Sequence, residues 1–100
     1  MSEPLTASAA VATDAPERHA KQLAAHLGRR SEVRTEDDGV RIVLGGGSCL
    51  LRTRPGMLDL HASAADAESL DRVTDVVGRH LERFGQRDEL HVEWSGTALP

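Results

Sequence analysis

Residues 66–85 read DAESLDRVTDVVGRHLERFG, and this stretch predicts a long amphipathic helix. Its apolar residues recur at the i, i+3, i+7, i+11 and i+14 positions, which are Leu70, Val73, Val77, Leu81 and Phe84. Asp66 is a residue type that caps the free N–H groups of a first turn, and Gly85 ends the pattern. Charged residues occupy the opposite face. One side of this helix must therefore cover an apolar surface.

Strand patterns surround this helix. Residues 40–44, 48–53 and 57–63 are strand-like, and glycine-containing turns at 45–47 and 54–56 separate them. Further strands are predicted at 6–13, 31–36 and 89–94, and a second helix, with a narrower apolar stripe, is predicted between Asp14 and Leu27. Strands joined by short turns are antiparallel neighbours, and two amphipathic helices can cover one face of one sheet. The sequence therefore predicts an α+β, two-layer sandwich with a mainly antiparallel sheet and the order β-α-β-β-β-β-α-β.

Length and composition fit one small domain. The chain has 100 residues, of which 39% are hydrophobic and 28% charged, as in a globular protein. We expect a single α+β domain over residues 6–94, with a flexible N-terminus at 1–5 and a flexible tail at 95–100. The glycines at 45–47 are expected to form a hairpin turn, because no lysine and no helix follow them as a phosphate-binding loop requires.

Charge and cysteine content exclude several classes of function. Twelve basic residues against sixteen acidic ones give a net charge of −4, which is unfavourable for a nucleic-acid binder. The single cysteine, Cys49, excludes an internal disulfide framework and a multi-cysteine zinc site. The apolar runs are too short for a membrane span, and the first residues lack a signal-peptide pattern. We therefore expect a cytoplasmic protein with no metal, no cofactor, no nucleic-acid partner and no membrane partner.

Four groups of residues carry a resemblance to a known family: 11–14 with Pro16; Cys49 with Arg52; 64–68 and 76–85; and 87–90 with 92–94. From Val11 onward the chain resembles the small bacterial proteins grouped as domain of unknown function 2218. The resemblance implies a stand-alone α+β domain, of a kind found beside or fused to siderophore-interacting flavin reductases. It implies an accessory role in iron acquisition and supplies no catalytic residue. The glycines at 45–47 depart from the family pattern, which has bulkier strand residues there.

The strands flanking the long helix supply the main candidate site. If Leu58, Leu60, Leu90, Val92 and Trp94 face the helices, alternation sends the polar residues between them to the uncovered sheet face. These residues are Asp59, His61, Glu89, His91 and Glu93. Two histidines and three carboxylates on one surface can bind a ligand or a cation, or transfer protons. A solvated polar face explains the same pattern.

Three further residues complete the candidate binding set: Cys49, Arg52 and His80. A lone cysteine in a strand is usually buried and inert, although a pairing with histidine is a conceivable nucleophile. Cys49 is expected on the uncovered face together with Val43 and Leu51, if Ile42, Leu44 and Leu50 face the helices. His80 lies four residues from both Val76 and Phe84, so it borders the core as a packed, hydrogen-bonded side chain or lines a pocket.

Three functions stay open. The first is a non-enzymatic accessory or ligand-binding module that uses the uncovered sheet face, beside a siderophore-interacting reductase. The second is a small enzyme that uses a histidine and a carboxylate of that face. The third is a structural homodimer in which two such faces meet.

Overall fold

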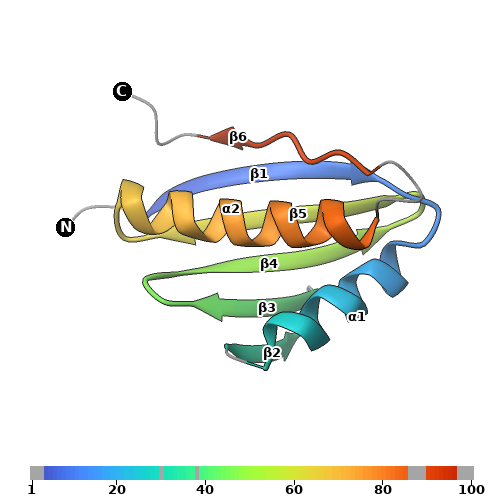
Figure 1. The fold of residues 1–100 in the computed structure, drawn as a ribbon, viewed down its shortest axis with the longest axis horizontal. Helices are drawn as coiled ribbons and strands as arrows, with labels where there is room; N and C mark the ends of the chain where they lie inside the picture. The colour runs from blue at the N-terminus through green and yellow to red at the C-terminus, as the bar shows by residue number, and fades with distance from the viewer. Residues whose placement is uncertain (1–3, 30, 38, 86–89, 97–100) are drawn as a thin grey trace.

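The computed structural model describes residues 4–29, 31–37, 39–85 and 90–96. In this part of the chain, two helices lie on one face of an antiparallel sheet (Figure 1). The elements follow in the order β1 (Leu5–Ala12), α1 (Pro16–Leu27), β2 (Glu32–Glu36), β3 (Gly39–Leu44), β4 (Gly47–Arg54), β5 (Met57–Ala64), α2 (Ala67–Phe84) and β6 (Ser95–Gly96). The strand order in the sheet is β2-β3-β4-β5-β1-β6. The predicted two-layer α+β architecture is confirmed.

Helix α2 covers the centre of the sheet. Its apolar stripe packs on β5, β4 and β1, and Val73, Val77 and Leu81 are completely buried there. The Asp66 side chain accepts a 2.7 Å hydrogen bond from the Ser69 N–H and caps the first turn as predicted. Of the helices in the described residues, neither combines the length and the apolar composition needed to cross a membrane.

Helix α1 covers the other half of the same face, over β3 and β4, and contacts α2 at its side (Figure 1). Leu23 and His19 are the residues of α1 that are most deeply buried. The opposite face of the sheet carries no helix, so the predicted uncovered face is present.

The register of β4 differs from the one we expected. Cys49 and Leu51 face the helices and are fully buried, whereas Leu50 lies on the uncovered face. Pairing explains the difference, because Cys49 lies opposite Ile42 and Ala62, which are both buried. Paired residues share one face of a sheet. The run of three consecutive apolar residues at 49–51 lacks the alternation that would have shown this register.

The end of the chain also differs from the expected strand at 89–94. Residues 90–94 form no strand, and the two-residue β6 that follows pairs with β1 instead. Leu90 is buried, and Val92 and Trp94 pack against the core as the alternation predicted, but they do so along the side of α2. The sheet thus begins at Leu5 and ends at Gly96. The remaining parts of the expected termini, 1–3 and 97–100, and Glu89 lie outside the described residues.

Gly45 and Gly46 form the expected hairpin turn between β3 and β4. Gly47 is the first residue of β4, so no helix follows the turn. Gly45 takes the left-handed conformation, with φ of 56°, that such a turn requires. At Gly47, a Cβ would lie 2.9 Å from Val73 Cγ2 and 2.5 Å from the Ser63 carbonyl oxygen. A side chain at Gly47 would therefore separate β4 from α2.

The buried stripe of α2 predicts a contrast between two neighbouring positions. Leu81→Ala should lower the free energy of unfolding by about 2–5 kcal/mol, because it removes a fully buried side chain from the core. Arg79→Ala should cost less than about 1 kcal/mol, because the Arg79 side chain is 76% exposed and its pairing with Asp75 is on the surface. Urea titrations of the two variants measure this difference, and equal losses would contradict the assigned apolar face.

Candidate functional site

One row of side chains crosses the uncovered face of the sheet at a single register level. The Cα partners in this row, from β2 to β6, are Arg34, Arg41, Leu50, His61, Ser8 and Ser95. Because side chains at paired positions point to the same face, this row places Leu50 between Arg41 and His61, and Arg34 lies one strand beyond Arg41. His61, one of the candidates from the sequence, is near the centre of the row.

A hollow of about 380 Å³ lies over this row. Its lining contains the Arg41 guanidinium, the His61 imidazole and the Leu50 side chain, together with four hydroxyl groups from Thr6, Ser8, Ser63 and Ser95. Among the described residues, no carboxylate lines it. The hollow therefore presents one permanent cation, one imidazole and four hydroxyl groups, and each of these groups can donate a hydrogen bond.

Arg41 is held in place by its neighbours on the sheet. Its Nε and Nη2 atoms donate to the two Glu36 carboxylate oxygens, at 2.8 and 3.3 Å, and Nη1 donates to Ser48 Oγ at 3.1 Å. The hydrogen bonds from Arg41 also lower the pKa of Glu36. These bonds use three of the five N–H groups of a guanidinium. Two N–H groups are left without a bond among the described residues, on a side chain that is already oriented.

The next row of the face contains Arg52 opposite Asp59. Asp59 forms a bidentate ion pair with Arg54, with Nε–Oδ2 and Nη2–Oδ1 distances of 2.6 and 2.9 Å. The hydrogen bonds from Arg54 hold the pKa of Asp59 below its usual value, with a smaller contribution in the same direction from the charge of Arg52. Asp59 is therefore an ionised partner of arginine, and it is poorly suited to accept a proton in catalysis.

The expected grouping of His91 and Glu93 with His61 is wrong. His91 is exposed beside α2, with Nδ1 3.7 Å from Glu82 Oε2 and Nε2 3.4 Å from Glu93 Oε1. The cause is the path of residues 90–94, which run along α2 and add no strand to the uncovered face. Glu89 lies outside the described residues. The face thus keeps Asp59, His61 and Arg52 from the predicted set.

Cys49 and His80 also lie away from this face. Cys49 is buried under the helices, and this burial raises the pKa of its thiol to about 12, so it cannot act as a nucleophile near neutral pH. His80 is half-buried, and its Nδ1 lies 2.6 Å from the Val76 carbonyl oxygen, to which it donates. Its ring lies 4.9 Å from the ring of His26, at the junction of the two helices. Cys49 and His80 are therefore both packed side chains, which is one of the two alternatives that the sequence left open for each of them.

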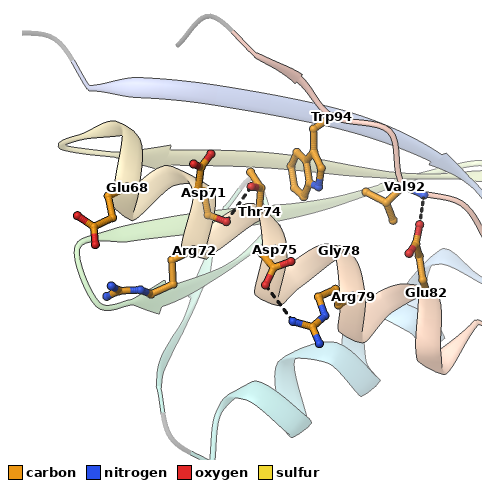
Figure 2. Close-up of a pocket in the computed structure, with 10 residues that line it drawn as sticks. All are labelled: Glu68, Asp71, Arg72, Thr74, Asp75, Gly78, Arg79, Glu82, Val92 and Trp94. Atoms are coloured by element: carbon orange, nitrogen blue, oxygen red, sulfur yellow. Dashed lines mark hydrogen bonds and ion pairs between the residues drawn. The ribbon is translucent and has the colours of Figure 1, made fainter. Parts of the chain in front are cut away.

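A second hollow was not predicted from the sequence. It is a shallow groove of about 690 Å³ along α2, bounded by residues 92 and 94 (Figure 2). Trp94 lies across Gly78, where a Cβ would be 3.1 Å from the indole Nε1. A glycine inside a long helix destabilises it by about 1 kcal/mol relative to alanine, so Gly78 was a signal of close packing at this point.

The described residues contain no group of three histidine, cysteine or acidic side chains that could hold a metal ion. His61 has no carboxylate within hydrogen-bond distance in this part of the chain. The uncovered face therefore offers a guanidinium, an imidazole and hydroxyl groups that can bind a ligand.

Comparison with known proteins identifies relatives of the whole domain. A family model described as an uncharacterized protein conserved in bacteria (DUF2218) matches residues 8–95. The NMR structure of PA4090 from Pseudomonas aeruginosa is similar, with a TM-score of 0.76 and 25% sequence identity over 96% of this chain and 99% of that chain. No curated protein matches.

The burial of Cys49 predicts that its thiol is inert in the native protein. A water-soluble thiol reagent should react with Cys49 only after unfolding, for example in about 6 M guanidinium chloride, because the buried thiol is protonated and inaccessible. A matched control places the thiol at the exposed position Thr53→Cys in a Cys49→Ala background, which should react at once. Native protein that reacts as fast as this control would contradict the assigned register of β4.

The Arg54–Asp59 pair predicts a dependence of stability on pH. A depressed pKa in the folded state stabilises the protein above the ordinary value of 3.8, and this stabilisation is lost as the pH falls through the folded value. Asp59→Asn should therefore lower the urea midpoint slightly at about pH 7 and leave it unchanged at about pH 2, where the carboxyl group is protonated. Equal losses at both pH values would mean that the ion pair is not the stabilising interaction.

Proposed function

This chain belongs to the family of uncharacterised bacterial proteins DUF2218, and from that premise we propose that it is a non-enzymatic module that binds an anionic, oxygen-rich ligand on its uncovered sheet face. The ligand we propose is a ferric chelate of the siderophore type. The binding site is the hollow over the Arg41–Leu50–His61–Ser8 row.

The donor-rich lining of this hollow carries the proposal. A carboxylate or another oxyanion on the ligand would accept hydrogen bonds from the two remaining N–H groups of Arg41 and from the serine and threonine hydroxyls. Leu50 offers an apolar floor between Arg41 and His61. A volume of about 380 Å³ falls within the usual range for a small-molecule site.

The neighbouring groups favour binding over catalysis. Arg54 holds Asp59 ionised, Cys49 is buried on the other side of the sheet, and His91 is beside α2. A single imidazole with hydroxyl neighbours binds and orients a ligand, but it lacks a second titrating group for acid–base chemistry. The enzymatic alternative therefore has no support from the geometry.

The link to iron comes from the resemblance, and the hollow adds a matching ligand chemistry. Ferric chelates that carry excess carboxylate or catecholate oxygens are anions, and a pre-oriented guanidinium is the group that binds them best. The reaction partner we propose is a siderophore-interacting flavin reductase, which would reduce the bound chelate. A homodimer through the same face would cover Arg41 and His61 and compete with this ligand.

Titration calorimetry with ferric citrate, iron-free citrate and inorganic phosphate tests the proposal. We expect saturable binding of ferric citrate, and Arg41→Gln and His61→Ala should each weaken it by about tenfold through the loss of charged or directed hydrogen bonds. Both variants should unfold at nearly the wild-type temperature, because both side chains are on the surface of the sheet.

Arg29→Gln, which changes an exposed arginine near the end of α1, is the matched control and should leave binding unchanged. Absence of saturable binding by all three anions would refute the ligand site. Equal affinity for iron-free citrate and ferric citrate would refute the link to iron. Sedimentation of a stable dimer that Arg41→Gln disrupts would favour the structural alternative.

A further inference from the structure

The groove along α2 presents a stripe of carboxylates beside an aromatic ring (Figure 2). The side of α2 that contains Gly78 also contains three carboxylates, at the i, i+4 and i+11 positions, which are Asp71, Asp75 and Glu82. Glu68 extends this acidic side toward the start of the helix. Against these four carboxylates, the groove has two guanidinium groups, those of Arg72 and Arg79. The formal excess is two negative charges, half of the net charge of the whole chain.

The two arginines do not neutralise the groove evenly. Arg79 Nη1 pairs with Asp75 Oδ2 at 3.1 Å, and the Arg72 guanidinium points away from Trp94 in Figure 2. Glu82 Oε2 accepts the Val92 N–H at 3.0 Å. Asp71 lies on the same side of α2 as Trp94 (Figure 2). Neither Asp71 nor Glu68 has an ion-pair partner among the described residues.

Trp94 adds an aromatic surface to this acidic stripe. Its ring is half-buried, with the pyrrole edge against Gly78 and the rest of the ring lining the groove. The indole N–H donates no hydrogen bond within the described part of the chain. A guanidinium group stacks on an indole and pairs with a carboxylate at the same time, which an ammonium group does less well.

We propose that this groove is the docking site for an arginine-bearing segment of a partner protein. The arginine side chain lies over the Trp94 ring and pairs with Asp71. This surface is separate from the anion site, because α2 lies on the covered side of the sheet. Charge complementarity selects the occupant, since the groove repels acidic segments and the hollow of the other face attracts them.

The composition of the chain gives a direct assay. Trp94 is the only tryptophan and there is no tyrosine, so fluorescence excited in the indole band comes from this groove alone. The probes are two short synthetic peptides that differ only in one residue, arginine or its uncharged analogue citrulline. We expect the arginine peptide to change Trp94 emission saturably and to bind about fivefold or more tightly than the citrulline peptide.

Variants separate the groove from other surfaces. Asp71→Asn should weaken binding of the arginine peptide by about threefold or more, and Glu68→Gln should weaken it less. Glu17→Gln, an exposed change on α1, should leave the affinity unchanged. All three positions are exposed, so folding is expected to persist and is checked by thermal unfolding.

Three results of the peptide titrations would overturn the proposal. They are equal affinity for the arginine and citrulline peptides, no saturable emission change up to about 5 mM peptide, and full binding by Asp71→Asn. Concentration-dependent self-association that is reported by Trp94 emission and lost in Asp71→Asn would assign the groove to a second copy of the chain, which also overturns it.

Discussion

The contact between the apolar stripe of α2 and the centre of the sheet is the interaction on which the rest of the structure depends. Val73, Val77 and Leu81 are completely buried against β5, β4 and β1. These three strands can be covered only if their buried residues share one face, and this requirement sets the register of each strand. Polar residues that alternate with the buried ones, such as Asp59, His61 and Ser63 of β5, are then directed to the opposite face.

The candidate anion site follows from that register. His61 is on the uncovered face because its neighbours Leu60 and Ala62 are needed in the core. Antiparallel pairing then places Leu50 and Ser8 beside His61, and Arg41 beyond Leu50. The ion pair with Glu36 and the bond to Ser48 fix the guanidinium of Arg41 in this row. A surface with such oriented donors suits a ligand whose charge is negative.

The other side of the molecule has the opposite electrostatic character. Gly78 allows Trp94 to lie directly on α2, and the chain before β6 consequently runs along the helix. This path places His91 beside Glu82 and leaves the acidic stripe of α2 bordered by an aromatic ring. The uncovered face of the sheet and the groove along α2 therefore differ in the charges they present, and they lie on opposite sides of the sheet.

The sequence by itself determined the two helices, the antiparallel hairpins and the positions of Asp59 and His61, because helical spacing and strict alternation are local properties of the chain. It did not determine the face of Cys49, since three consecutive apolar residues fit either register until Ile42 and Ala62 pair with it. Nor did it determine the row that joins Arg41 to His61, or the place of His91. Those depend on which strands become neighbours and on how closely Trp94 approaches Gly78, and only packing across the whole molecule decides such long-range contacts.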